Sequence, residues 1–307
     1  MTSMSILLLG SKGLLGQAFQ SVANVMNIPL VALSRQEINI HSNAQIQVGL
    51  APFSDAKTII NCAAFTQVDQ AETAFDEATL SNETGVKYLS EYCRDHEIRL
   101  CHFSTDYVFN GQSSAPYSED APCDPINAYG RSKFLGEQAL MATTSNFYLF
   151  RIQWLFGDHG PHFLSTMTRL ANTQDSLSVV SDQWGSPSWS IDIAIAVLSM
   201  ISINAPTGIY HLANQGYTTW YDLAKLIFQF QKINCPVHSI LSHDYPRPAK
   251  RPLNGRLNTS RYHEVSSYAM PTWQDSVQSY LSIKRPEQLP YTFRERIATI
   301  NTLKPYQ

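Results

Sequence analysis

The sequence predicts a doubly wound α/β fold, in which helices cover both faces of a parallel sheet, followed by a smaller mixed α/β lobe. Three observations predict it. Short apolar runs alternate with helical patterns over the first half of the chain, the first run ends in a glycine-rich turn, and the alternation becomes irregular beyond residue 151. A chain of 307 residues is long enough for one full hydrophobic core and a second, smaller lobe.

Short apolar runs have the composition of strands that are buried on both faces of a parallel sheet. They lie at residues 6–9, 30–33, 58–62, 100–103 and 147–152. Helical patterns separate them, for example at residues 43–50 and at residues 83–96, where apolar side chains recur at helical spacing. This alternation implies right-handed crossovers between parallel strands.

The second half of the chain has fewer regular patterns. Residues 191–201 form a helical pattern, and residues 209–212 have the composition of a short strand that can return to the sheet. We therefore expect a first domain at residues 1–150, with a return segment near 185–215, and a second lobe mainly at residues 151–307.

Composition and charge exclude several classes of function. The net charge of −3 gives no global attraction to nucleic acid or to anionic lipid. No apolar run approaches the ~20 residues needed to cross a bilayer, and the first residues lack the basic segment of a leader. We expect a cytoplasmic enzyme with neither nucleic acid nor membrane as a partner.

Cysteine and histidine spacing predicts no metal site. The five cysteines are odd in number and never spaced as Cys-x-x-Cys, which predicts reduced thiols. His159 and His162 form a His-x-x-His pair, but no third ligand accompanies them.

Gly10, Gly13 and Gly16 are spaced three apart where the first strand turns into a helix. Backbone without side chains lets a pyrophosphate approach the amide N–H groups of a helix N-terminus, where the helix dipole favours negative charge. The preceding strand and the amphipathic residues 17–26 supply the context that a dinucleotide-binding turn requires. A tight packing turn is the alternative explanation for the three glycines.

The end of the second strand bears on the choice between NADPH and NADH. The acidic residue expected there for a ribose diol is replaced by Leu33-Ser34-Arg35. A hydroxyl and a guanidinium suit a 2′-phosphate, which favours NADPH, although Arg35 can equally be a solvated surface arginine. After the third strand, Ala63 and Ala64 leave room for a cofactor at the switch point of the sheet, and they are also ordinary core residues.

Residues 102–111, at the end of the fourth strand, and residues 127–137, in a helix, carry candidate catalytic groups. Tyr129 and Lys133 are four apart, so their phenol and ammonium share one helical face. A free phenol has a pKa of about 10, and a nearby cation stabilises the phenolate, which brings its proton-donating power towards neutral pH. Such pairs are common on solvated helices. Combined with a phosphate-binding turn and a strand-end Thr105, this pair predicts proton transfer beside a bound dinucleotide.

These elements, in this order, resemble the extended, sugar-nucleotide-modifying branch of the short-chain dehydrogenase/reductase superfamily, whose cofactor domain is Rossmann-like. Further blocks, from residue 5 to about residue 280, are similar to the dTDP-4-dehydrorhamnose reductase family. They are STDYVFNG, YGRSKFLGE, FRIQWLFG, FLSTMTRLA, LSVVSDQWGSPS, GIYHLAN and YPRPAKRPLNGRLNTSRY. The resemblance implies reduction of dTDP-4-dehydro-β-L-rhamnose to dTDP-β-L-rhamnose by hydride from NADPH or NADH, in the supply of surface polysaccharide.

The resemblance also implies roles for individual residues. Thr105 would hydrogen-bond the C4 carbonyl of the keto sugar, and Tyr129 would deliver the proton as hydride arrives at carbon. Lys133 would bond the nicotinamide ribose and lower the tyrosine pKa. Asp106 and Trp154 match positions that contact the sugar nucleotide, although Trp154 can equally be a core tryptophan. The expected cofactor-binding set is Gly10, Gly13, Leu14, Leu15, Gly16, Ser34, Arg35, Asn39, Ile40, Ala63, Ala64, Phe65, Thr66, Tyr129 and Lys133.

A basic cluster lies in a proline-rich loop of the second lobe. It consists of Arg247, Lys250, Arg251 and Arg256. We expect it to clamp the diphosphate of the substrate, with Arg256 as a substrate-binding residue. A solvated basic loop is the alternative.

A few positions depart from the family pattern. Ile152-Gln153 stand where the family more often has Thr-Ser, so the sugar pocket can differ. Asn39 stands where Asp is usual. Gln17 replaces an acidic residue that some members use in a metal-bridged dimer, which leaves both a homodimer and Mg²⁺ open.

Alternative functions stay open at this stage. A dehydratase would need Asp-Glu after the strand-end threonine, and here Thr105-Asp106 is followed by Tyr107. A reductase acting on another nucleotide-linked keto sugar fits the same motifs. So does an epimerase, which would retain its dinucleotide tightly instead of exchanging it at every turnover. A non-catalytic regulatory subunit built on this fold would also keep these motifs.

Overall fold

The computed structural model describes residues 6–266 and 268–283, and its centre is a six-stranded sheet. The strand order is β10-β5-β4-β3-β1-β2, and every pairing is parallel. The strands are β1 (Ile6–Leu9), β2 (Leu30–Leu33), β3 (Thr58–Asn61), β4 (Arg99–Thr105), β5 (Phe147–Ile152) and β10 (Gly208–Leu212). The five strands predicted for the first half are confirmed, with β3 one residue shorter and β4 extended at both ends.

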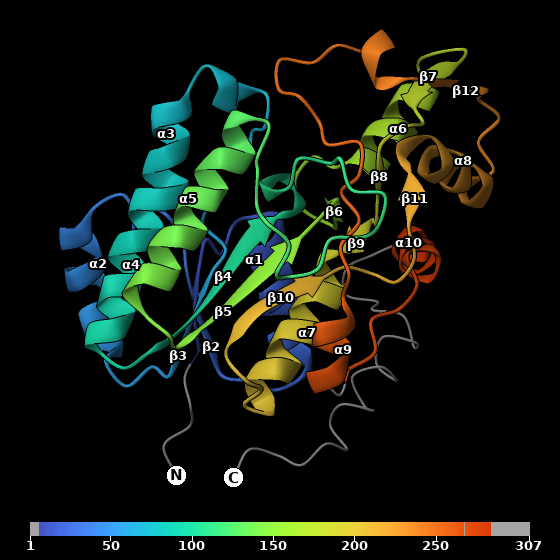
Figure 1. The fold of residues 1–307 in the computed structure, drawn as a ribbon. Coiled ribbons are helices and arrows are strands. Elements are labelled where there is room, and N and C mark those ends of the chain that lie inside the picture. The colour runs from blue at the N-terminus through green and yellow to red at the C-terminus, as the bar shows by residue number, and fades with distance from the viewer. Residues whose placement is uncertain (1–5, 267, 284–307) are drawn as a thin grey trace.

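Helices cover both faces of this sheet (Figure 1). One face carries α1 (Leu14–Val25) and α7 (Ser190–Ser202), which pack against each other. The opposite face carries α2 (Asn43–Leu50), α4 (Gly85–Asp95) and α5 (Ala128–Thr143). Successive residues of β1 alternate between the two apolar cores, as the period of two in a strand requires. The predicted doubly wound, Rossmann-like fold is therefore confirmed.

The strand order places a crevice at the carboxyl ends of β1 and β3. From β1 the chain crosses to β2 on one side, and β3 then pairs with β1 on the other. The loops that follow two such neighbouring strands run in opposite directions, and this leaves a ligand site between them. The glycine-rich turn follows β1, and Ala63 follows β3, so both predicted cofactor segments meet at this point.

The return to the sheet is also confirmed, since β10 pairs with β5 and the helix predicted before it is α7. The remaining strands form small two-stranded sheets, namely β6 (Leu155–Phe156) with β9 (Ser188–Trp189), β7 (Leu177–Val180) with β12 (Val237–Ile240), and β8 (Trp184–Gly185) with β11 (Thr218–Thr219). Helices α6 (Phe163–Ala171), α8 (Trp220–Gln231), α9 (Ser260–Val265) and α10 (Trp273–Ser282) complete this half. The domain boundaries stay predictions, and residues 284–307 of the predicted lobe lie outside the described residues.

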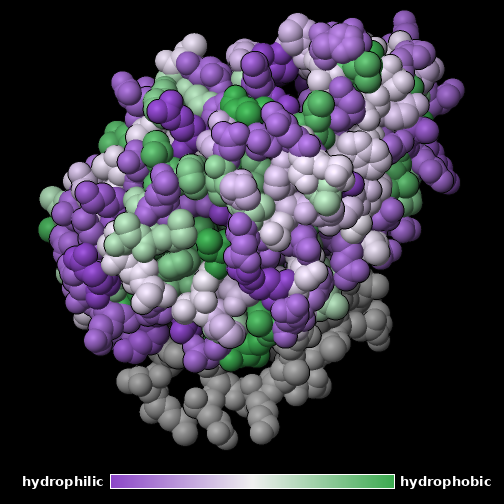
Figure 2. All heavy atoms as spheres, viewed as in Figure 1, coloured by the Kyte–Doolittle hydropathy of each residue, from purple (hydrophilic) through white to green (hydrophobic). Residues whose placement is uncertain are grey.

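Short helical turns connect the main elements. They are α3 (Phe75–Thr79), the 3₁₀ turns η1 (Ala51–Phe53), η2 (Gln70–Glu72), η4 (Asp106–Val108) and η5 (Ser242–Asp244), and the π-helical turn η3 (Leu80–Thr84). Within the described ranges, no helix is long and apolar enough to cross a membrane. On the face drawn in Figure 2, hydrophilic residues surround scattered groups of hydrophobic ones.

Candidate active site

The three glycines of the first turn have different surroundings. Gly10 has a φ of +76°, and a Cβ there would lie 2.6 Å from the backbone nitrogen of Ala63. A Cβ on Gly16 would lie 2.3 Å from the carbonyl oxygen of Gly10. At Gly13 the same oxygen would be 3.5 Å away, which is an ordinary contact. Packing therefore explains Gly10 and Gly16, whereas Gly13, the N-cap of α1, leaves the helix N-terminus open to a ligand.

A pocket of about 560 Å³ opens beside this turn, at the carboxyl ends of β1, β2 and β3. The predicted cofactor residues that line it are Gly10, Gly13, Ser34, Arg35, Asn39, Ile40, Ala63 and Ala64. Lining residues that sequence analysis missed are Lys12, Gln36, Ile38, His41, Cys62 and Ser81. Among these, Lys12 had a readable signal, because it is a cation inside the glycine-rich turn itself.

Charged groups at one end of the pocket fit a phosphate-bearing ligand. Arg35 is exposed, and the Lys12 Nζ donates to the Gln36 side-chain oxygen over 2.8 Å. The Ser34 amide and hydroxyl both donate to Glu37 Oε2, at 2.7 and 2.8 Å, and these bonds lower the pKa of Glu37. Two cations thus stand at this end, while the nearby acid is already held by Ser34.

The other predicted cofactor residues lie around the pocket instead of in its lining. Leu15 and Gly16 are buried beneath the turn, and Leu14 and Thr66 are also not among the residues that line the pocket. Phe65 is fixed through its backbone. Its N–H donates to Asn82 Oδ1 over 2.9 Å, and its carbonyl oxygen accepts from Asn82 Nδ2 over 3.0 Å.

Asn82 is a site residue that sequence analysis missed. It lies in the π-helical turn η3, is buried, and also donates to Ser132 Oγ on α5 over 2.9 Å. It therefore ties the Phe65 segment to the helix that carries the candidate catalytic pair. A Cβ on Gly136 would lie 1.9 Å from the Asn82 carbonyl oxygen, so this glycine allows the close approach. Asn82 precedes the predicted helical pattern of residues 83–96, so no sequence pattern indicated its role; π turns are frequent at functional sites.

Helix α5 presents Lys133 to the interior. Its N-cap is Asn127, whose Oδ1 accepts from the Gly130 amide over 2.7 Å. Lys133 is buried, and its Nζ lies 3.5 Å from His102 Nε2. Burial lowers the pKa of Lys133 to about 8, and the Glu137 carboxylate one turn further on opposes that shift. The His102 pKa is lowered well below its usual value, chiefly by burial.

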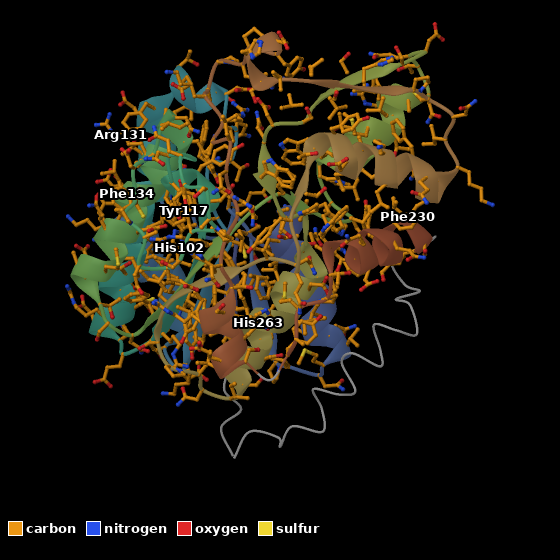
Figure 3. The ribbon with its side chains drawn as sticks, turned by 45° about the vertical axis from the view of Figure 1, so that its right-hand side comes forward. His102, Tyr117, Arg131, Phe134, Phe230 and His263 are labelled. Carbon is orange, nitrogen blue, oxygen red and sulfur yellow. The ribbon has the colours of Figure 1, made fainter. Side chains whose placement is uncertain are left out.

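The outer face of the same helix is different. Figure 3 shows Arg131 and Phe134 on α5, with His102 deeper in the molecule. The Arg131 guanidinium lies 5.4 Å from the centre of the Phe75 ring. Lys133, by contrast, points inward: its Nζ lies near His102, and His102 Nδ1 lies 3.3 Å from Asn61 Nδ2 at the end of β3. Asn61 directly precedes Cys62, which lines the cofactor pocket, so Lys133 lies behind that lining.

Thr105 stands between Asp106 and Tyr129. Its Oγ1 donates to Asp106 Oδ1 over 3.1 Å and accepts from the Tyr107 amide over 3.2 Å. Burial raises the pKa of Asp106 to about 7. Burial and the Asp106 carboxylate also raise the pKa of Tyr129, while a hydrogen bond with Thr105 acts in the opposite direction. The net shift of the Tyr129 pKa is thus upward, and the lowering that was expected from Lys133 is not found among the described residues of this structure.

Trp154 is stacked on a second tryptophan, Trp220. Trp154 has a φ of +45°, and its ring stacks on Trp220 with centroids 3.5 Å apart. A Cβ on Gly185 would lie 2.5 Å from the Trp154 Cε2. The protein itself therefore packs against the indole from two directions, and a sugar contact by Trp154 stays a prediction. Gln153 beside it is buried, and both of its amide heteroatoms lack a hydrogen-bond partner among the described residues.

The structure divides the basic cluster of the proline-rich loop. Arg247 and Arg251 both pair with Asp69, so one carboxylate offsets part of their combined positive charge within the protein. Arg256 lies elsewhere. Its Nε donates to Asn254 Oδ1 over 2.8 Å, and its guanidinium lies 5.9 Å from the Trp184 ring centre. A diphosphate contact by Arg256 stays a prediction.

Histidine and cysteine have local roles in the structure. All five cysteines are free thiols, as predicted. His162 caps α6 through Nδ1, and its Nε2 lies 3.1 Å from the Tyr280 hydroxyl. No group of three potential metal ligands gathers within residues 6–266 and 268–283.

The fold is that of a dinucleotide-dependent oxidoreductase of the extended short-chain dehydrogenase/reductase class. It combines a parallel sheet with an open crevice, a glycine-rich turn and the Thr105, Tyr129 and Lys133 side chains. A family model described as the RmlD substrate binding domain matches residues 4–285. The chain belongs to this family.

Relatives support the assignment over most of the chain. A dTDP-4-dehydrorhamnose reductase of Aggregatibacter actinomycetemcomitans is 35% identical, over 89% of this chain and 97% of its own. A dTDP-4-keto-6-deoxy-D-glucose reductase of Streptomyces niveus is 39% identical, over 73% and 77% of the two chains. The crystal structure of a dTDP-4-dehydrorhamnose reductase from Bacillus anthracis in complex with NADP has a TM-score of 0.87 and 29% identity, over 91% of this chain and 99% of that one.

Proposed function

We propose that this chain reduces dTDP-4-dehydro-β-L-rhamnose to dTDP-β-L-rhamnose with NADPH, as a dTDP-4-dehydrorhamnose reductase that supplies surface polysaccharide synthesis. The observation that carries the proposal is the contact between the Thr105 and Tyr129 side chains at the end of β4, with Lys133 buried one helical turn after Tyr129. The names of relatives that match about nine-tenths of the chain support the same substrate.

The chain's own residues suit a bound dinucleotide. The open N-terminus of α1 at Gly13 suits the pyrophosphate, and Lys12 and Arg35 suit a 2′-phosphate. Lys133 would bind the nicotinamide ribose. When bound, NADPH supplies the hydride that reduces C4 of the sugar.

Thr105 and Tyr129 act on the sugar oxygen. The Tyr129 hydroxyl can donate a hydrogen bond to the C4 carbonyl, and the Thr105 hydroxyl can do so once it turns from Asp106 Oδ1 to the sugar; both bonds favour the negative charge that develops on the oxygen. The upward pKa shift keeps the Tyr129 phenol protonated at neutral pH, so it has a proton to give to the nascent alkoxide. The Lys133 ammonium, with a pKa of about 8, is still mostly charged at pH 7 and stabilises the phenolate that remains.

A second candidate substrate is dTDP-4-keto-6-deoxy-D-glucose. It is favoured by the 39% identical relative that is named for its reduction. The Ile152-Gln153 pair, which departs from the common family pattern, also allows a different sugar pocket.

The deciding experiment incubates the protein with NADPH and a panel of dTDP- and UDP-linked 4-keto sugars and identifies each product. We expect many turnovers with the L-rhamno sugar, and a fall in kcat of about 10²- to 10⁴-fold for Tyr129→Phe. Faster turnover of the D-gluco sugar would favour the second candidate. Tightly retained oxidised dinucleotide would indicate an epimerase, and no turnover with any sugar would indicate a regulatory subunit.

Assembly and location follow as further proposals. We expect the enzyme in the cytoplasm, where nucleotide sugars and NADPH are made. A homodimer is expected from the family resemblance, and sedimentation with and without Mg²⁺ tests both the dimer and a metal in it.

A further inference from the structure

Asp69 gathers donors from a loop that is far away in the sequence. It lies just before η2, and its Oδ1 accepts from Arg251 over 2.6 Å and from the Ala249 amide over 3.2 Å. Its Oδ2 accepts from Arg247 Nε over 3.1 Å. These bonds outweigh the cost of partial burial and lower the pKa of Asp69 to about 2. The carboxylate therefore binds residues 247–251 to the cofactor half of the molecule.

The same loop contacts the N-terminus of the catalytic helix. Asn127, the N-cap of α5, donates from Nδ2 to the Lys250 carbonyl oxygen over 2.8 Å. Glu72 Oε1, three residues after Asp69, accepts from the Ala128 amide over 2.8 Å. In Figure 1 the segment after β12 passes the end of α5 where that helix begins. The first turn of α5 is thus held by the 69–72 segment and by the loop.

Arg251 connects Asp69 to Tyr107, whose ring contacts the ring of Tyr129. Besides its bond to Asp69, Arg251 hydrogen-bonds the Tyr107 hydroxyl. The Tyr107 ring lies edge-on to the Tyr129 ring, with centroids 6.0 Å apart. A shift of Arg251 would therefore be transmitted to Tyr129 through one aromatic contact.

We propose that Asp69 is a positioning residue for the reduction: by fixing residues 247–251 against the first turn of α5, it sets where the Tyr129 phenol lies relative to Thr105. The inference rests on the proposed function for its chemistry. It also gives the loop arginines a role different from the predicted diphosphate clamp. Asp69 does not touch the reacting atoms, so its effect is on geometry.

The test compares Asp69→Asn with Asp120→Asn. Asp120 also pairs with an arginine of the second half, Arg261, but its side chain is exposed, and this ion pair involves no residue of α5. We expect Asp69→Asn to lower the single-turnover rate of sugar reduction by about 10- to 100-fold, because small misplacements of a reacting group cost that much. The solvent deuterium isotope effect should rise as proton donation becomes limiting, while NADPH affinity stays within about twofold. Asp120→Asn should leave all three unchanged.

A second measurement does not depend on turnover. With tyrosine labelled at Cζ with ¹³C, the Tyr129 resonance is assigned by its loss in Tyr129→Phe. We expect that resonance to move in Asp69→Asn and to stay in place in Asp120→Asn. An unmoved resonance, or a rate loss with an unchanged isotope effect that follows only the unfolded fraction, would overturn the proposal. Failure of the proposed function would show instead as wild-type protein inactive on every sugar while the resonance still moves.

Discussion

Asp106 is a buried carboxyl whose charge opposes folding. Its pKa is raised from 3.8 to about 7, chiefly by burial. Between those pH values the folded protein keeps a proton that the unfolded protein has released, so stability falls as pH rises through this range. At about 1.4 kcal/mol per pKa unit, the upper bound of the loss is about 4 kcal/mol.

Substitution of Asp106 by Asn should remove this pH dependence. In urea unfolding, we expect the free energy of unfolding of the wild type to fall relative to that of Asp106→Asn between about pH 4 and pH 7. Above pH 7 the two curves of free energy against pH should run parallel. Asp55→Asn, at an exposed position, is the control and should follow the wild type. Parallel curves for wild type and Asp106→Asn across the whole range would contradict the raised pKa.

Gln153 has a buried amide for which the described residues provide no partner. It follows β5 directly, and β5 pairs with the strand that ends at Thr105. Since buried polar groups in native complexes are nearly always satisfied, we expect the amide to bind the sugar nucleotide. Gln153→Met keeps the shape and removes the polar atoms.

The expected result is a split between stability and affinity. Without ligand, the free energy of unfolding of Gln153→Met in urea should equal that of the wild type or exceed it by up to about 1 kcal/mol, because an unsatisfied amide is removed. The KM for the sugar nucleotide should rise about tenfold. Ser199→Ala removes a different buried polar group without a described partner, the Ser199 hydroxyl on α7, and should leave KM unchanged. A wild-type KM in Gln153→Met would rule out the contact.

At the scale of elements, the glycine-rich turn makes two of its glycines structural and one functional. We expect Gly10→Ala to lower the free energy of unfolding by roughly 1–3 kcal/mol or more, because its φ is positive and its Cβ would meet Ala63. Gly13→Ala should change stability by less than about 0.5 kcal/mol and weaken NADPH binding instead. Thermal unfolding and fluorescence titration measure the two effects. A Gly13→Ala protein that binds NADPH normally would show that the pyrophosphate does not approach there.

The elements that sequence analysis found and missed differ in a physical way. The strands of the main sheet are buried on both faces, so each leaves a contiguous apolar run that is visible in the sequence. Strands β6 and β9 have two residues each, too few for a period, and they pair across more than thirty positions. The π-helical turn η3 was missed for another reason. A search for apolar residues at a period of 3.6 does not detect a single turn that contains one residue more than an α-helical turn.

At the scale of the whole molecule, the candidate site was predictable where its chemistry is local. Tyr129 and Lys133 are one helical turn apart and the glycines form one short turn, so these local patterns, taken together with Thr105 at a strand end, indicated the candidate site. The Asp69 and Arg251 pair joins positions 182 residues apart, and no local pattern links them. The stacking of Trp154 was not predicted either, because Trp154 lies between β5 and β6 whereas its partner Trp220 belongs to the distant helix α8.

Cofactor choice is also a property of the whole molecule, because a ligand that binds only the folded state raises the stability of the entire chain. At about 100 times Kd, NADPH should add about 2.7 kcal/mol. For a chain of 307 residues that corresponds to a rise in Tm of roughly 4 °C. At the same concentration NADH should give a smaller rise, because it lacks the 2′-phosphate that Lys12 and Arg35 can bind. Arg35→Ala should reduce the NADPH shift and leave the NADH shift unchanged. Equal shifts for the two dinucleotides in the wild type would assign Arg35 to the solvated surface.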